Sequence, residues 1–183
     1  AEWTKFGRYD QAVSSTGIRL DFYTNSSTFY FAASQGTNFE LFINGKSKEI
    51  SSTGIFDVKL EDNGENRITV LFPNHQMNTT VKEVRIDESA TLTPYTYDRK
   101  FLILGDSITQ GYSAVTDSLS WANRITRMFN ADSLIQAISG GCYQPSTLDP
   151  NVDFTPDYIL VAYGTNDWYW GRSSMEDFKS YAK

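Results

Sequence analysis

Three apolar runs in the second half of the chain each end in a turn of small, polar residues. The runs and their turns are 101–104 before Gly-Asp-Ser at 105–107, 134–138 before Ser-Gly-Gly at 139–141, and 158–163 before Gly-Thr-Asn-Asp at 164–167. Short apolar runs bounded by turns are typical of the buried strands of a parallel sheet. Because ligands of open α/β sheets bind at the carboxyl ends of the strands, the pattern predicts a hydroxyl, a glycine pair and an amide at one sheet edge.

The segment between the first two runs has the spacing of a helix. Ser120 is a suitable N-cap for a helix over 120–130. Its apolar face consists of Trp121, Ala122, Ile125, Met128 and Phe129. A second helix is expected near the end of the chain, where Ser173 and Glu176 have capping-box spacing and Met175, Phe178 and Ala182 form a stripe. Alternation of strands and helices predicts an α/β domain over 101–183.

Residues 1–90 follow a different pattern, in which apolar and polar residues alternate with a period of two. The alternating runs centre on Leu20, Leu41, Val58 and Val70, and Asn-Gly at 44–45 is a hairpin signal. Short strands separated by turn residues predict a β-sandwich of jelly-roll type. Residues 91–100 have no clear period and contain Pro94, so we expect a linker there.

Composition excludes several classes of protein. The 183 residues carry a net charge of −6 and a pI near 4.8, which argues against nucleic-acid binding. No apolar run approaches the ~18 residues of a membrane-spanning helix. Cys142 is the one cysteine, which excludes an intramolecular disulfide and suggests a small buried residue. No signal-peptide pattern opens the chain, so we expect any leader to have been removed; a secreted bacterial protein fits, and so does a cytoplasmic one.

Ser107 is the candidate nucleophile. A serine hydroxyl becomes reactive when a base takes its proton and nearby donors receive the negative charge on the oxyanion. The alternative is that Ser107 caps the helix that follows the turn. Asp106 and Asp167 are expected to hold their turns by accepting backbone N–H groups rather than to transfer protons.

The three blocks resemble those of the SGNH (or GDSL) hydrolase superfamily, whose signature residues are Ser, Gly, Asn and His in that order. The resemblance implies a three-layer α/β/α domain in which Ser107 is the nucleophile. It also implies an oxyanion hole formed by the Ser107 N–H, the Gly140 N–H and the Asn166 side chain. Gly141 competes with Gly140 for this role. The alternatives are a tight turn for the glycine pair and a loop or helix cap for Asn166.

The fourth block of the family, Asp-x-x-His, has no counterpart in this chain. The one histidine, His75, precedes Ser107 and is expected to be a loop residue. The resemblance therefore implies that the chain supplies the N-terminal half of the hydrolase domain and is inactive alone. In the resembled fold, the strand at 158–163 would be interior. We expect the missing C-terminal segment, as further sequence or as a second chain, to pair with that strand and bring the catalytic histidine to Ser107.

A β-sandwich before these blocks is most similar to carbohydrate esterase family two. Members of this family remove acetyl groups from plant-wall polysaccharides such as xylan. The resemblance implies acyl-enzyme chemistry on an acetylated oligo- or polysaccharide, without a metal or organic cofactor. Trp168 and Trp170 are candidates for stacking on a sugar, with core packing as the alternative. Other interpretations are a lipase or thioesterase of the same superfamily, or a carbohydrate-binding module with a degenerate hydrolase half.

Overall fold

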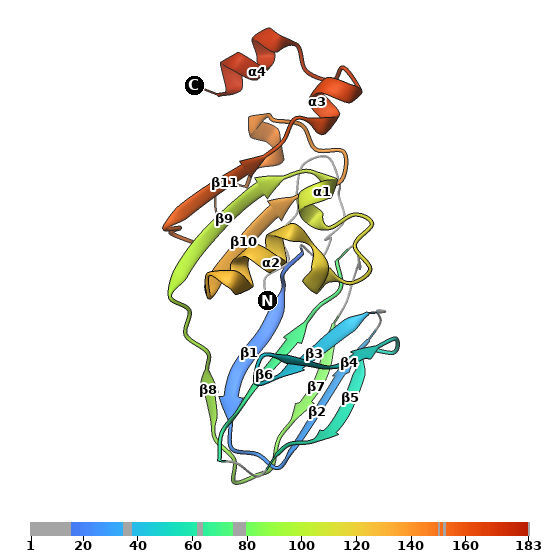
Figure 1. The fold of residues 1–183 in the computed structure, drawn as a ribbon, viewed down its shortest axis with the longest axis vertical. Helices are drawn as coiled ribbons and strands as arrows, with labels where there is room; N and C mark the ends of the chain where they lie inside the picture. Colours follow the sequence, from blue (N-terminus) through green and yellow to red (C-terminus); the bar gives the residue numbers. More distant parts are fainter. Residues whose placement is uncertain are drawn as a thin grey trace.

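The protein folds as a β-sandwich followed by a parallel α/β unit, stacked along the long axis of the molecule (Figure 1). The computed structural model describes residues 16–34, 38–61, 64–74, 80–149, 151 and 153–182. His75 lies outside these residues.

Two antiparallel sheets form the sandwich. The strands are β1 (Arg19–Thr24), β2 (Thr28–Ala33), β3 (Phe39–Ile43), β4 (Lys46–Ser51), β5 (Ile55–Lys59), β6 (Asn66–Leu71), β7 (Val81–Arg85) and β8 (Leu92–Pro94). One sheet has the order β4-β3-β6-β1-β8 and the other has the order β5-β2-β7. Their facing side chains form one core, rich in phenylalanine. A two-sheet sandwich is therefore present, and its finer assignment as a jelly roll stays a prediction.

The core explains the alternation in the sequence, because every second side chain of each strand faces the other sheet. Phe31 is fully buried, and its ring contacts those of Phe39, Phe56 and Phe72 at centroid distances of 5.6, 6.1 and 5.9 Å. The expected hairpin joins β3 to β4. Asn44 and Gly45 both have positive φ, 51° and 76°, as a two-residue hairpin with matched twist requires.

Part of the expected linker belongs to the sandwich. Leu92–Pro94 forms β8 and pairs with β1 at the sheet edge, where Pro94 costs no ladder hydrogen bond. The α/β unit begins five residues later with β9 (Arg99–Gly105).

The parallel sheet has the order β10-β9-β11, so the first strand in the chain lies between the second and the third. Its other two strands are β10 (Ala131–Ala137) and β11 (Tyr158–Ala162). In the register of the sheet, Gly105 of β9 is the partner of Ala137 in β10 and of Ala162 in β11. The three polar turns therefore leave the sheet at the same edge, as the sequence predicts.

The helices are short, and two of them differ from expectation. They are α1 (Ser107–Gln110), η1 (Asp117–Leu119), α2 (Trp121–Met128), η2 (Pro145–Thr147), α3 (Thr165–Tyr169) and α4 (Met175–Tyr181). Ser120 caps α2 as predicted, by accepting the Asn123 N–H. The predicted apolar face is only partly buried, because Met128 and Phe129 are 80% and 47% exposed.

Trp121, Ala122 and Ile125, the rest of that predicted face, pack against the core of the parallel sheet. Next to them, α2 buries a second, polar face made of Asn123 and Thr126. Asn123 is buried and donates to Thr16 and to the backbone of Asp117, at 3.0 and 3.1 Å. The predicted capping box of α4 is displaced by one residue. Ser174 and Asp177 form it. Ser173 cannot serve as the cap because its hydroxyl bonds to Asp167 at 2.6 Å.

Buried carboxylates join the two parts of the molecule. Glu40, on β3, accepts hydrogen bonds from the backbone and hydroxyl of Ser118 in η1. Asp117, also in η1, accepts from the Thr16 hydroxyl and, at 2.9 Å, from the Gly17 N–H. Both oxygens of each carboxylate accept hydrogen bonds across this boundary. The sandwich and the α/β unit are therefore docked in a defined orientation.

Candidate active site

Ser107 is the first residue of α1, and the residue before it performs the capping. Asp106 is the N-cap, and its Oδ1 accepts the Ile108 N–H at 2.9 Å. The expectation that Asp106 holds its turn through backbone N–H groups is confirmed. The alternative role of Ser107 as a helix cap is wrong. Its side chain is partly exposed, and its hydroxyl makes no hydrogen bond to a residue that the structure describes.

The turn from β9 into α1 depends on the absence of a side chain at Gly105. A Cβ placed there would lie 2.1 Å from Thr109 Oγ1 and 2.5 Å from Thr109 Cβ. Thr109 is fully buried on α1 and packs directly against the strand end. Glycine therefore allows the helix to start immediately after the strand, which places Ser107 above the sheet edge.

The loop after β10 separates the roles of its two glycines. Gly140 has φ of 74°, in the left-handed region that glycine adopts without strain. The Gly141 N–H donates to the Ile138 carbonyl at 2.9 Å. The Gly140 N–H has no acceptor among the described residues. Of the two glycines, Gly140 is thus the one with a donor available to a ligand.

Asn166 connects all three turns. It lies in α3, is 6% exposed, and its Nδ2 donates to the Gly141 carbonyl at 2.8 Å. The same nitrogen lies 3.5 Å from Asp106 Oδ2. The N-cap of α3 is Gly164, so the alternative of Asn166 as a helix cap does not hold. One amide hydrogen of Asn166 thus bonds to the second loop. The other has only the long contact with Asp106, the residue before Ser107.

Two further residues, which the sequence analysis did not single out for this purpose, fix the second loop. Arg172 Nη1 donates to the Gly140 carbonyl at 2.9 Å. Both oxygens of Asp167 accept the Tyr143 N–H at 3.1 Å, which confirms Asp167 as a residue that holds a turn. The sequence signal for Asp167 is its place next to Asn166. Arg172 carries no such signal, because its contact depends on how the chain folds back after α3.

The site contains carboxylates but no described imidazole. Burial raises the pKa of Asp106, and the neighbouring charge of Asp167 raises it further, against the hydrogen bond from Ile108. No histidine is among the described residues, since His75 is the only one in the sequence. The described residues thus place a hydroxyl and amide donors together without a general base.

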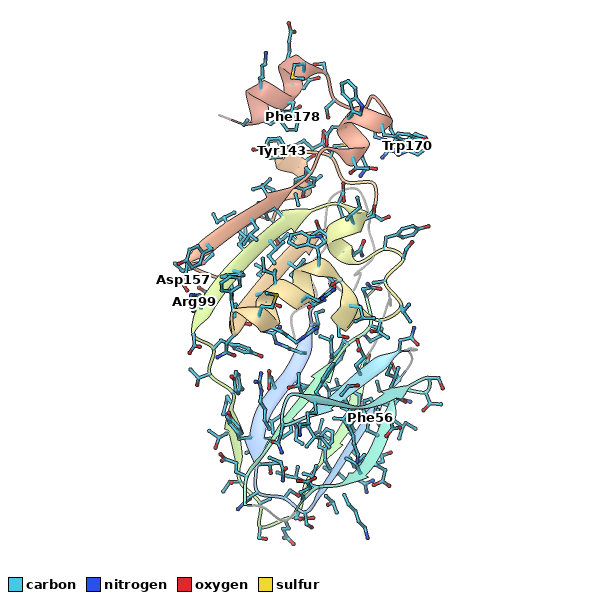
Figure 2. All side chains as sticks on the ribbon, in the orientation of Figure 1. Phe56, Arg99, Tyr143, Asp157, Trp170 and Phe178 are labelled. Carbon is cyan, nitrogen blue, oxygen red and sulfur yellow. The ribbon has the colours of Figure 1, made fainter. Side chains whose placement is uncertain are left out.

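Aromatic side chains near the third turn face solvent. Trp168 and Trp170 are 85% and 62% exposed, and the Tyr169 ring stands edge-on to Trp170 at 4.8 Å. Figure 2 shows Trp170 projecting from the molecule, while Tyr143 and Phe178 lie close together with ring centroids 4.9 Å apart. Both tryptophans therefore have ring faces open to solvent in this chain, and their role in stacking on a sugar stays a prediction.

The third strand of the sheet has an open edge. Among the described strands, β11 pairs only with β9. Tyr158, Ile159 and Val161 are 55%, 59% and 53% exposed. An apolar strand with unpaired backbone groups is a template for pairing with another chain segment. Figure 1 shows β11 at the outer edge of the α/β unit, away from the sandwich.

The remaining sequence predictions concern the cysteine, metal binding and membrane-spanning helices. Cys142 is buried, as predicted. Within the described ranges, no three His, Cys, Asp or Glu side chains gather in a way that could hold a metal ion. No helix in the same part of the chain is long and apolar enough to cross a membrane.

Comparisons with known proteins show what the chain is similar to. Residues 103–183 match the model of the GDSL-like Lipase/Acylhydrolase family. The solved structure of a salicylyl-acyltransferase, SsfX3, from a tetracycline biosynthetic pathway has a TM-score of 0.75 and 21% identity. It aligns with 93% of this chain, which spans 54% of the acyltransferase. No curated protein matches the chain.

Two carbohydrate esterases also share the fold. A family two carbohydrate esterase from Clostridium thermocellum, solved with cellohexaose, has a TM-score of 0.66 and 18% identity over 93% of this chain and 66% of its own. The acetyl xylan esterase Est2A from the rumen bacterium Butyrivibrio proteoclasticus has a TM-score of 0.66 and 17% identity over 90% of this chain and 61% of its own. The chain thus spans about half to two thirds of these three proteins.

Proposed function

We propose that residues 103–183, which match the GDSL-like lipase/acylhydrolase family, supply the nucleophile and oxyanion donors of a serine esterase. The observation that carries the proposal is the division of tasks between Asp106 and Ser107. Because Asp106 caps α1, the Ser107 hydroxyl is free at the sheet edge where the Gly140 N–H and the Asn166 amide also lie.

The chemistry follows from these groups. The Ser107 oxygen attacks the acyl carbonyl while a base takes the hydroxyl proton, and the carbonyl oxygen becomes an oxyanion. The N–H groups of Ser107 and Gly140 and the second amide hydrogen of Asn166 are the proposed donors to that oxyanion. Collapse of the intermediate breaks the ester bond, and the protonated base returns its proton to the leaving alcohol. Water then attacks the acyl-serine, releases the acid and restores Ser107.

The base is proposed to be a histidine on a polypeptide segment that pairs with β11. The exposed apolar edge at Ile159 and Val161 supports this, because strand pairing there would cover both side chains and backbone groups. The solved proteins that share the fold are longer than this chain, which agrees with a larger domain. The segment belongs to the same polypeptide or to a second chain.

The proposed substrate is an acetyl ester of a carbohydrate. Trp168 and Trp170 offer exposed ring faces next to the third turn, where an amphipathic sugar can stack. Two of the solved proteins with this fold are a carbohydrate esterase crystallised with cellohexaose and an acetyl xylan esterase. An enzyme acting on plant-wall polysaccharide meets its substrate outside the cell, so we propose a secreted protein.

Rates of ester hydrolysis by the complete polypeptide test the substrate class. We expect faster release of acetate from acetylated xylo-oligosaccharides than of octanoate from an octanoyl ester. Trp170→Ala should raise KM for the oligosaccharide and leave KM for a small acetyl ester unchanged. Preference for the octanoyl ester would favour the lipase or thioesterase alternative. Oligosaccharide binding without any hydrolysis would favour a carbohydrate-binding module.

A further inference from the structure

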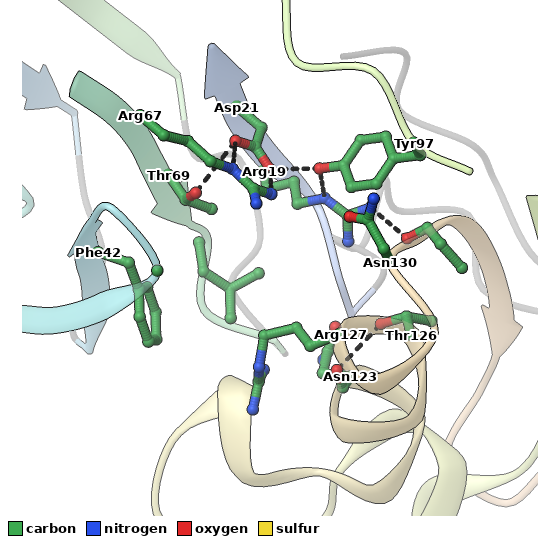
Figure 3. Close-up of a pocket in the computed structure, with 13 residues that line it drawn as sticks. Arg19, Asp21, Phe42, Arg67, Thr69, Tyr97, Asn123, Thr126, Arg127 and Asn130 are labelled. Atoms are coloured by element: carbon green, nitrogen blue, oxygen red, sulfur yellow. Dashed lines mark hydrogen bonds and ion pairs between the residues drawn. The ribbon is translucent and has the colours of Figure 1, made fainter. Parts of the chain in front are cut away.

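A cavity of about 290 Å³ lies between the sandwich and the α/β unit, far from Ser107. Figure 3 shows its walls: β1, β3 and β6 of the sandwich on one side and α2 on the other. Asn130 and Ala131, at the amino end of β10, also line it. Because Ser107 follows the carboxyl end of the neighbouring parallel strand, the cavity and the candidate active site lie at opposite ends of the sheet.

Three arginines and one aspartate supply the charges of the lining. The arginines are Arg19, Arg67 and Arg127, and Asp21 is the one acidic residue among the described residues of the wall. Arg19 also forms an ion pair with Asp132, outside the wall, at 3.3 Å. The surrounding protein has the opposite overall sign, with a net charge of −6. This concentration of positive charge is therefore a local property of the cavity.

Two of the arginines are held rigidly in place. Arg67 forms a two-pronged pair with Asp21, with distances of 2.9 and 2.6 Å, and its guanidinium lies 3.2 Å from the centre of the Tyr95 ring. Arg19 Nε donates to the Tyr97 hydroxyl at 2.6 Å. Because these bonds fix both guanidinium planes, little side-chain entropy would be lost on binding a ligand.

Each of the three guanidinium groups keeps unused donors. Arg19 uses its Nε for the Tyr97 hydroxyl and its Nη2 for the Ala131 carbonyl. Arg67 uses its Nε and Nη2 for Asp21. Arg127 uses its Nη2 for the Ser118 carbonyl, at 2.6 Å. The Nη1 groups have no acceptor among the described residues. Burial lowers the pKa of Arg127, the charge of Glu40 opposes this shift, and the charges of Arg124 and Arg19 lower the pKa further. An anion in the cavity would relieve that repulsion and accept the free N–H groups.

The uncharged part of the wall combines polar side chains, among them Thr69, Asn123 and Asn130, with an apolar portion that can hold the body of a ligand. Phe42 and Leu71 line the cavity together with Ala131. We infer that the cavity is a binding site for a small organic carboxylate, with the carboxylate on the arginine N–H groups and an apolar body against Phe42 and Leu71. Guanidinium groups pair with carboxylates through two parallel hydrogen bonds, which gives the site its preference for an anionic end.

The ligand would contact both parts of the molecule. Arg19 and Arg67 come from the sandwich, and Arg127 comes from α2. A carboxylate that bridges them adds hydrogen bonds across the boundary that Asp117 and Glu40 already join. Binding should therefore raise the melting temperature of the whole protein, since a ligand that binds only the folded state stabilises it.

Calorimetric titration at constant ionic strength tests the site with three probes. Benzoate carries a ring and a carboxylate, benzyl alcohol carries the ring without the charge, and inorganic phosphate carries the charge without the ring. We expect saturable one-to-one binding of benzoate and at least about tenfold weaker binding of the other two probes. Arg127→Gln should weaken benzoate binding about tenfold, the loss expected for one charge-assisted contact.

Arg124→Gln is the matched control, because Arg124 lies on the same helix but not in the cavity wall. It should change the benzoate affinity less than about twofold, and circular dichroism melts establish that both variants fold. Absence of saturable benzoate binding overturns the inference. So does an equal loss in both variants, or phosphate binding as tight as that of benzoate.

Discussion

At the scale of single residues, the candidate site depends on side chains that hold others in place. Asp106 takes over the cap of α1, Arg172 fixes the Gly140 carbonyl, and Asp167 fixes the Tyr143 N–H. These groups contribute to the site by positioning other groups, without contacting substrate themselves. Their combined effect is a second loop whose free N–H group keeps one direction, which is what stabilisation of an oxyanion by fixed donors requires.

Asn166 is the proposed side-chain donor to the oxyanion, and its substitution tests that role. We expect Asn166→Ala to lower kcat by about 10²–10³ with little change in KM, because a donor to the oxyanion acts in the transition state. Steady-state rates of the complete polypeptide on an acetyl ester give both constants. A change confined to KM would make Asn166 a residue that binds the ground state.

At the scale of elements, the apolar runs of the sequence predicted the strands of the parallel sheet. The runs in 101–104, 134–138 and 158–163 became β9, β10 and β11 in the expected order, because parallel strands bury continuous apolar runs. The prediction for α2 was partly wrong. Trp121, Ala122 and Ile125 pack on the sheet as expected, but α2 also buries Asn123 and Thr126. The distant partner of Asn123, Thr16, cannot be found from local spacing.

The same limit explains what the sequence could not predict about the site. The family blocks indicated Ser107, Gly140 and Asn166, but not which group caps α1 or which glycine N–H is free. Those answers depend on hydrogen bonds between segments far apart in the chain, such as that between Arg172 and Gly140. The displaced capping box of α4 has the same origin, since a distant partner, Asp167, takes the Ser173 hydroxyl.

The open edge of β11 yields a prediction about activity. Val161→Lys places a charge on the exposed strand and should hinder pairing with the segment that carries the base, as lysine does on natural edge strands. We expect the complete polypeptide to lose at least about tenfold in kcat/KM on an acetyl ester. Val84→Lys is the control, because β7 is an edge strand of the sandwich and Val84 is also exposed. Equal activity of the two variants would contradict the role of β11.

At the scale of the whole molecule, one buried acid at the boundary, Asp117, links stability to pH. Burial raises the pKa of Asp117 from 3.8 to about 6, against the hydrogen bonds from Thr16 and Gly17. The folded state therefore binds more protons than the unfolded state between about pH 4 and pH 6. This contribution is fully present below about pH 4 and is lost as the pH rises through 6. A shift of this size corresponds to about 3 kcal/mol.

Urea unfolding between pH 4 and pH 7 checks this contribution. Asp117→Asn removes the titrating group and keeps its volume, so its free energy of unfolding should fall less over this range than that of the wild type. Asp153→Asn, at an exposed loop position, should follow the wild type. An unchanged pH dependence in Asp117→Asn would show that the carboxylate does not titrate at the boundary as described.

The role of Ser107 as nucleophile is tested most directly by acetate release from an acetylated oligosaccharide by the complete polypeptide. Ser107→Ala should lower kcat by at least about 10⁴ and leave the thermal melt unchanged, because the hydroxyl has no described hydrogen-bond partner to lose. Ser146→Ala, an exposed serine near the same sheet edge, should retain the wild-type rate. A Ser107→Ala variant that keeps most of the wild-type rate would contradict the account.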